Sequence, residues 1–333
     1  MIKLIIQRLF WSVFTLFTVS IIVFLGTEVL PGDVAQAILG QSATPESLAS
    51  LRSQLGLDRP AYIRYFDWSF GIIRGDLGIS LAGGVPISGL IMERLGNTLL
   101  LAGVTAAVAV PFAIVIGLLA AMYPGSTFDR MVSMVTLFLV SMPEFLIASF
   151  LVLIFAVHLG WLPAISYTTD FQSIKHLFVI LALPILTLSF VIAAGIARMT
   201  RATILNIMDS LYIEMALLKG NSRKRIVFKH ALVNIIGPLA NIVALNLTFL
   251  IGGVVIAETI FSYPGLAKLI VDAVLTRDFP VVQACALVFS FIYIILILAA
   301  DIAAVLANPK LTKFKDNKGG KSLWEKDRQE VTQ

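Results

Sequence analysis

Six long runs of residues that are uncharged or nearly so decide what this chain can fold into. Each run can cross the ~30 Å hydrocarbon core of a bilayer as a helix, which takes about 20 residues. The 333 residues are 58% hydrophobic and only 14% charged, with a mean hydropathy of +0.93. A soluble domain of this size could not bury so much apolar surface. We expect an all-α polytopic membrane protein whose six transmembrane helices lie within 9–26, 97–123, 131–157, 177–197, 231–257 and 279–300.

The distribution of positive charge predicts the orientation of these helices. Lys3 and Arg8 precede the first run, as in a secretory signal peptide. However, that run is longer than the ~7–15 apolar residues of such a peptide, and no A-x-A pattern follows it, so we expect a retained membrane helix. With a cytoplasmic N-terminus, about two thirds of the 25 Lys and Arg residues fall on the cytoplasmic side. The positive-inside rule therefore predicts that both termini are cytoplasmic.

The segment 30–96 is the long extracytoplasmic part of this topology, and its capping residues, prolines and glycines predict two short helices. Thr44 can cap a helix that has Pro45 at its first position. A second helix is expected from Pro60 to Arg74, where a glycine follows. We expect the two helices to form a small amphipathic cap packed on the bundle. The second helix also carries residues typical of an aromatic belt at the membrane surface, namely Tyr62, Tyr65, Phe66, Trp68 and Phe70.

A basic segment, "EMALLKGNSRKRIVFKHALVN" at 214–234, separates the fourth and fifth runs. Its first part is compatible with a helix that Gly220 ends. Ala216 and Gly220 are four residues apart, so on a helix they would share a face without bulky side chains. Such a face lets another protein approach closely, and the charges beside it suit a cytoplasmic partner. The alternative is that the positive charge only fixes topology and attracts anionic lipid.

Ionisable residues within the apolar runs are candidates for a transport pathway. Glu144 follows Pro143 in the third run, where the proline must break or kink the helix. Glu28 lies at the outer end of the first run, and Asp301 at the inner end of the sixth. Each has a simpler alternative, since Glu28 and His158 could reach interfacial water and Asp301 could pair with a cytoplasmic cation.

The basic segment resembles the cytoplasmic "EAA" loop of permease subunits of bacterial ABC importers, in the branch that moves dipeptides, oligopeptides and nickel. Other patterns of that branch occur in order along residues 1–310. They are "PGD" at 31–33, "LGLDRP" at 55–60, "GDLGIS" at 75–80, "NTLLLA" at 97–102, "SMPEF" at 141–145, "ARMTRATIL" at 197–205, "ETIFSYPGL" at 258–266 and "RDFPVVQ" at 277–283.

The resemblance implies the type I importer (MetI-like) fold and a non-catalytic membrane subunit of the bacterial inner membrane. Its partners would be a second homologous permease, two ABC ATPase subunits and an extracytoplasmic solute-binding protein, besides membrane lipid; nucleic acid would not be among them. No cofactor is expected on this chain, which has no P-loop; ATP and Mg²⁺ would be bound by the ATPases. The residues that would contact the ATPase are Tyr212, Glu214, Ala216, Lys219, Gly220, Arg223 and His230.

Three parts are expected along the chain. Residues 1–95 would hold the first transmembrane helix and the extracytoplasmic helical segment. Residues 96–308 would form the permease core, with five helices and the coupling loop at 198–230. Residues 309–333 would be a charged cytoplasmic tail.

Two other classes compete with a permease subunit. A stand-alone secondary transporter or channel predicts internal repeats, and none is visible. A membrane-embedded enzyme needs a catalytic constellation, yet His158, His176 and His230 lie in different segments and the one cysteine, Cys285, excludes an internal disulfide. Short peptides are the expected cargo, with nickel chelates, sugars and opine-like compounds as alternatives.

Overall fold

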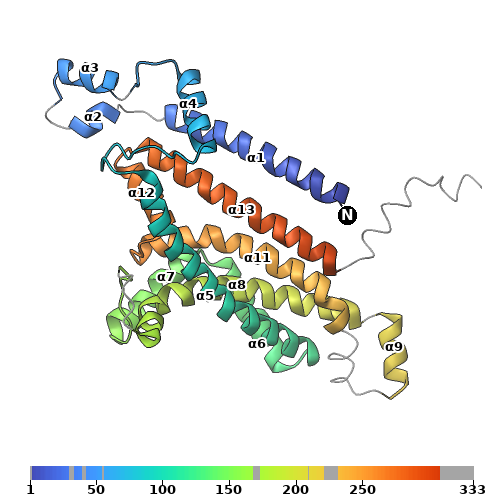
Figure 1. Ribbon diagram of the computed structural model, residues 1–333. Helices are drawn as coiled ribbons and strands as arrows, with labels where there is room; N and C mark the ends of the chain where they lie inside the picture. The colour runs from blue at the N-terminus through green and yellow to red at the C-terminus, as the bar shows by residue number, and fades with distance from the viewer. Residues whose placement is uncertain are drawn as a thin grey trace, which may run out of the picture.

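The computed structural model describes residues 2–29, 34–39, 43–54, 56–167, 173–208, 210–220 and 232–307. These residues are almost entirely helical, and their one β contact is an isolated bridge between Ile79 and Pro86. The helices form an elongated bundle with a smaller helical group at one end (Figure 1). In chain order they are α1 (Ile2–Val29), α2 (Val34–Leu39), α3 (Pro45–Gln54), α4 (Ala61–Ile73), α5 (Ile87–Met122), α6 (Thr127–Ser141), α7 (Glu144–Leu151), the π-helical η2 (Val152–His158), α8 (Ile174–Met208), α9 (Leu211–Leu218), α11 (Leu232–Ile260), α12 (Leu266–Leu275) and α13 (Phe279–Ala307).

Five helices of the described chain are long and apolar enough to cross a membrane, and a sixth crossing is made if α6 and α7 count as one broken span. The all-α, polytopic expectation is therefore confirmed. The helices are longer than the uncharged runs that predicted them. α5 begins at Ile87 because it continues through Glu93 and Arg94, and α11 ends at Ile260, which brings Glu258 into the span.

The third span is broken at the predicted proline. α6 ends at Ser141, α7 begins at Glu144, and the two axes differ by 106°. Pro143 has no backbone N–H and its ring would clash with the preceding turn of a continuous helix. It occupies the N-cap of α7 with an extended backbone, and its carbonyl accepts the N–H groups of Leu146 and Ile147 at 3.0 and 3.3 Å.

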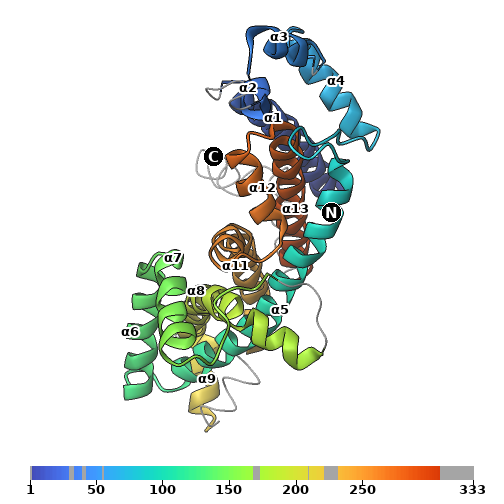
Figure 2. The same ribbon diagram turned by 90° about the vertical axis from the view of Figure 1, so that its left-hand side faces the viewer.

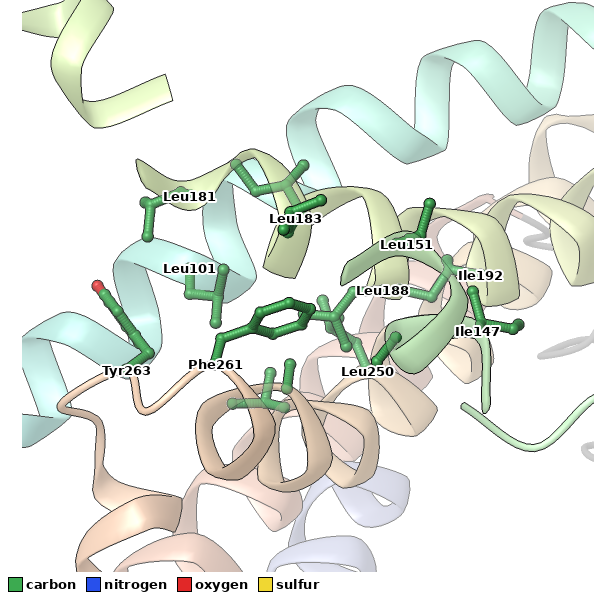
Figure 3. Close-up of a cluster of buried hydrophobic side chains, with 14 of the residues drawn as sticks. Leu101, Ile147, Leu151, Leu181, Leu183, Leu188, Ile192, Leu250, Phe261 and Tyr263 are labelled. Carbon is green, nitrogen blue, oxygen red and sulfur yellow. The ribbon is translucent and has the colours of Figure 1, made fainter. Parts of the chain in front are cut away.

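α8 is the central helix of the bundle. Half of its most apolar stretch is buried, against about a tenth for α1. It packs on α5, α11, α6 and α7, and Figure 2 shows α11 between α8 and α13. The largest buried cluster lies where α5, α7, α8 and α11 meet (Figure 3), and includes Leu101, Ile147, Leu183, Leu188, Leu250 and Phe261.

Small residues set the distance between α5 and α8. A Cβ atom placed on Gly117 would lie 2.5 Å from the carbonyl oxygen of Ala197 and 2.9 Å from the Cβ of Thr200. The two backbones are therefore in contact at Gly117, which is the usual way that transmembrane helices pack. By contrast, a Cβ on Gly103, nearer the N-terminus of α5, would meet nothing within 4 Å among the described residues.

The extracytoplasmic helices α3 and α4 begin where the capping residue and the prolines predicted, but only α4 packs on the bundle. The Thr44 hydroxyl accepts the N–H of Ser47 at 3.2 Å at the start of α3, and α4 follows Pro60. α4 lies against α1, where the Tyr65 hydroxyl is 2.8 Å from the Ser20 hydroxyl. α3 has no buried residue and its main neighbour is α2, so the expected cap on the bundle is wrong for α3.

Candidate functional site

The candidate coupling element, α9, lies at the end of the bundle beyond α8 (Figure 1). Ile213 is fully buried and packs against Ile207 and Met208 at the end of α8. The remaining described side chains of α9 and its end are exposed, with Met215 at 56% and Leu218 at 76%. Among the side chains of α9 that the structure describes, Ile213 is thus the anchor and the others are exposed.

Gly220 ends this element as predicted, but the predicted helical face is wrong. α9 stops at Leu218, and Gly220 has φ +77°, a left-handed conformation that suits a glycine after a helix end. Gly220 therefore does not continue the helix on which Ala216 lies. Glu214 and Lys219 are exposed. The side chains of Tyr212 and Ala216, and all of Arg223 and His230, lie outside the described residues.

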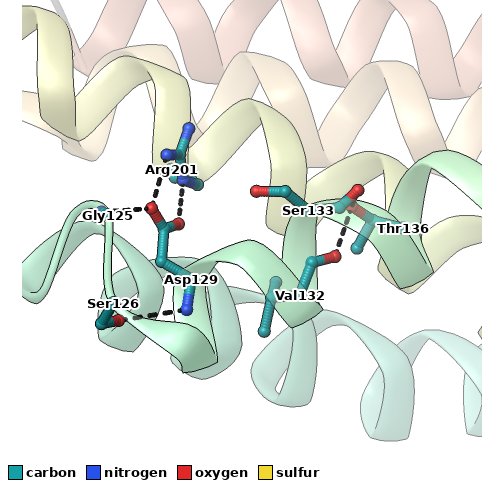
Figure 4. A network of polar contacts seen from close by, with 7 residues as sticks. All are labelled: Gly125, Ser126, Asp129, Val132, Ser133, Thr136 and Arg201. Atoms are coloured by element: carbon teal, nitrogen blue, oxygen red, sulfur yellow. Dashed lines mark hydrogen bonds and ion pairs between the residues drawn. The ribbon is translucent and has the colours of Figure 1, made fainter.

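A buried ion pair connects α6 to α8 near this end of the bundle (Figure 4). The Arg201 guanidinium contacts both carboxylate oxygens of Asp129, with Nη2 donating to Oδ2 at 2.8 Å. Oδ2 also accepts the N–H of Gly125 at 2.9 Å, and the N–H of Asp129 donates to the Ser126 hydroxyl at 3.2 Å. The Asp129 side chain is 3% exposed. The pair therefore ties the start of α6 to the helix that leads into α9.

A second buried carboxylate holds the other end of the bundle together. Glu258, fully buried in α11, accepts the Thr98 hydroxyl at 2.6 Å through Oε1. Its Oε2 accepts the N–H groups of Ala267 and Lys268 at 2.8 and 3.0 Å, at the start of α12. Such bonds satisfy N–H groups that a helix start leaves free. Glu258 thereby fixes α5, α11 and α12 relative to one another.

The loop between α11 and α12 forms two further hydrogen bonds with Asn97 of α5, close to this carboxylate. The Asn97 amide donates to the Pro264 carbonyl at 2.8 Å, and the Tyr263 hydroxyl donates to the Asn97 carbonyl at 3.1 Å. Burial, and then the charge of Glu258, raise the pKa of the Tyr263 hydroxyl, which keeps it a donor. The motifs "NTLLLA" and "ETIFSYPGL" thus form one polar cluster.

A third carboxylate, that of Asp278, holds the loop before α5 by three hydrogen bonds. Asp278 accepts the Ser80 hydroxyl at 2.5 Å and the N–H groups of Leu81 and Ala82 at 3.1 and 3.2 Å. It is 4% exposed. The motifs "GDLGIS" and "RDFPVVQ", far apart in the sequence, are therefore in direct contact.

The predicted pathway residues lie apart from one another. Glu28 forms an ion pair with Arg64 of α4, so it contributes to the extracytoplasmic group. Glu144 lies beside Pro143 at the break between α6 and α7, and its Oε2 is buried without a hydrogen-bond partner among the described residues. Asp301 belongs to α13 near its end, and its side chain lies outside the described residues. The structure does not bring these groups into one site.

Sequence reasoning missed Asp129, Glu258 and Asp278 as structural anchors. Each stands at or beyond the edge of an apolar run, where a charge looks like part of a loop. For two of them a motif was the available signal, since Glu258 opens "ETIFSYPGL" and Asp278 lies in "RDFPVVQ"; Asp129 lies in no such motif.

Comparison with known proteins shows the family to which the chain belongs. The profile of the family described as "binding-protein-dependent transport system inner membrane component" matches residues 113–313, and the profile of its N-terminal region matches residues 1–102. The chain belongs to this family. The permease is similar to the probable peptide ABC transporter permease protein y4tP of Sinorhizobium fredii, with 34% identity over 92% of this chain and 98% of the relative. It is also similar to the glutathione transport system permease protein GsiC of Escherichia coli K12, with 36% identity over 93% and 99%.

These relationships give the permease its class. It is a non-catalytic, multi-pass subunit of an ATP-driven importer in the inner membrane. The resemblance to the dipeptide and oligopeptide branch is confirmed, and a stand-alone transporter is not favoured.

Proposed function

We propose that the permease forms half of a translocation pathway for short peptides. The cargo class is supported by the names of its relatives, one a probable peptide permease and another a glutathione permease; glutathione is itself a tripeptide. The family description supports delivery by an extracytoplasmic binding protein. The other half of the pathway would be a second, related permease, and two ATPase subunits would supply ATP and Mg²⁺, which this chain has no P-loop to bind.

The coupling proposal rests on the position of α9 at the end of the bundle beyond α8. A helix that is anchored through Ile213, and that exposes Met215 and Leu218, has the form of a short docking element for a cytoplasmic partner. We place the ATPase contact on its exposed surface, at Glu214, Lys219 and Gly220, together with Tyr212, Ala216, Arg223 and His230. Because α9 follows α8 almost directly, a movement of α9 would act on the central helix of the bundle.

At the opposite end, α3 and α4 would help seat the binding protein. α3 has no buried residue, so its exposed side chains offer a surface for such a partner. The Glu28–Arg64 ion pair fixes α4 to α1 beneath it. Between the two ends, Glu144 at the Pro143 break and Asp301 near the end of α13 remain candidates for the pathway itself.

Reconstitution tests this function. The permease, its second permease, the ATPases and the binding protein are placed in proteoliposomes, and import of trialanine is measured. We expect import that requires both ATP and the binding protein. Import driven by a proton or sodium gradient without ATP would instead assign the permease to the secondary transporters.

A further inference from the structure

Glu144 has an environment unlike that of several other carboxylates in or beside the described spans. Three of them show how this fold compensates such a charge: Glu28 and Asp129 each pair with an arginine, and Glu258 accepts a hydroxyl and two backbone N–H groups. Glu144 has none of these. No donor among the described residues reaches its buried Oε2.

The carboxylate of Glu144 is held against the backbone of α11. A Cβ atom placed on Gly253 would lie 2.8 Å from Oε2 and 3.2 Å from Oε1 of Glu144, and 3.0 Å from Cδ2 of Leu188. The absence of a side chain at Gly253 therefore creates the space that the carboxylate fills. The helices that meet here contribute to one buried apolar cluster, which includes Ile147 of α7, Leu188 of α8, and Leu250 and Val254 of α11.

The position of Glu144 bears on what lies beside it in the membrane. Glu144 as a whole is only partly buried, although its Oε2 is buried, and it begins α7, which packs on α11. A carboxylate without a partner is costly against hydrocarbon, and such residues face a bundle interior or a water-filled path. A second permease or a water-filled pathway beside Glu144 would remove this cost.

We propose that Glu144 supplies the negative charge of a cargo-binding position in the pathway, and that it receives the ammonium group of a peptide. This inference rests on the proposed peptide function and adds the chemistry of one contact. An ammonium group matches the position because it is a compact cation with several donors and can satisfy both carboxylate oxygens. A contact that forms only while cargo passes also accounts for a carboxylate whose Oε2 is reached by no donor among the described residues.

The test compares Glu144→Gln with wild type in the reconstituted complex, and measures trialanine imported per ATP hydrolysed. We expect about a tenfold lower ratio, because a hydrogen-bonded charge contact of this size, about 1.4 kcal/mol, is lost while ATP hydrolysis stimulated by the binding protein continues. Glu144→Asp, which keeps the charge, should recover part of the loss. A defect of folding would instead lower import and hydrolysis together.

Two adjacent glycines provide a matched pair of controls. Gly253→Ala places a methyl group against the carboxylate and should lower the same ratio. Gly252→Ala adds the same methyl group where nothing lies within 4 Å, and should leave the ratio within about twofold of wild type. N-acetylated trialanine, which has no ammonium group, should show no difference between wild type and Glu144→Gln.

The possible results separate this proposal from the function it rests on. If the wild-type complex imports no peptide, the proposed peptide function fails. If wild type imports trialanine and Glu144→Gln imports it equally well per ATP, only the role of Glu144 is overturned. Loss of the second permease from purified Glu144→Gln complex would assign the carboxylate to a subunit contact, and equal losses with both peptides would exclude the ammonium group; either result overturns the proposal.

Discussion

The ion pair between Asp129 and Arg201 allows a prediction whose size follows from burial. The Asp129 side chain is 3% exposed and that of Arg201 is 28% exposed. In Arg201→Gln a buried carboxylate loses its charged partner and keeps one backbone donor, Gly125. Breaking a buried pair in this way typically costs about 3–5 kcal/mol of stability. Asp129→Asn should cost less, about 1.5–3 kcal/mol, because the arginine left behind is near enough to the surface to be hydrated.

The assay is unfolding of each purified variant in mixed detergent micelles, together with the double variant. The two changes should not be additive, because the double variant leaves no unpaired charge, and the coupling should fall within about 1–3 kcal/mol. Arg59→Gln is a matched control, since the Arg59–Asp67 pair is more than half exposed and should be worth about 0–1 kcal/mol. If Arg201→Gln costs no more than Arg59→Gln, the reasoning from burial is refuted.

Three further predictions follow from the packing. Gly117→Ala should destabilise the permease by about 1–3 kcal/mol because its Cβ would meet the backbone of α8, whereas Gly103→Ala should be nearly neutral in the same unfolding assay. Glu258→Gln should cost about 1.5–3 kcal/mol in that assay, since only one oxygen remains for three donors; no loss would show that the charge is not needed there. In intact cells, an impermeant thiol reagent should label Ser53→Cys but not Lys219→Cys, and labelling of both would contradict the cytoplasmic placement of α9.

Local sequence features were sufficient to predict most of the architecture. Hydrophobic runs located the spans, because a bilayer requires about 20 apolar helical residues and few other structures do. Proline and glycine marked the break at Pro143, the start of α4 after Pro60 and the stop at Gly220, since each acts through its own backbone geometry. These effects need no information from distant parts of the chain.

The contacts that assemble the bundle could not be predicted in the same way. The partners of Glu258 and Asp278 lie on other elements, the furthest of them, Ser80, 198 residues from Asp278. A charge at the edge of an apolar run has the same local pattern whether it meets water or a buried donor. Helix ends were misplaced for a related reason, because α5 continues through Glu93 and Arg94 beyond its uncharged stretch. The face shared by Ala216 and Gly220 was wrong because the glycine that stops a helix does not remain on it.

The central claim is that α9 and its end couple this permease to an ATPase. Gly220 provides the most direct test, since a Cβ there would meet nothing within 4 Å among the residues that the structure describes. Because Gly220 has φ +77°, any side chain there also strains the backbone, so an effect of bulk is assigned to a partner only where it exceeds the effect of that strain. Gly220→Asn is the control for backbone strain, because asparagine tolerates the left-handed conformation better than most residues.

The measurement is co-purification of the ATPase subunits with each variant, alongside peptide uptake. Gly220→Arg should yield a folded, inserted permease that binds the ATPases roughly 5- to 150-fold more weakly, as overpacking of a close contact by about 1–3 kcal/mol implies, and that does not transport. Gly220→Asn should retain most of both activities, and Arg223→Ala should be nearly silent, since one charge at the rim of an interface is typically worth only about 0–1 kcal/mol. If Gly220→Arg retains the ATPases and transports as wild type does, α9 is not the coupling element and the basic segment serves only to orient the protein in the membrane.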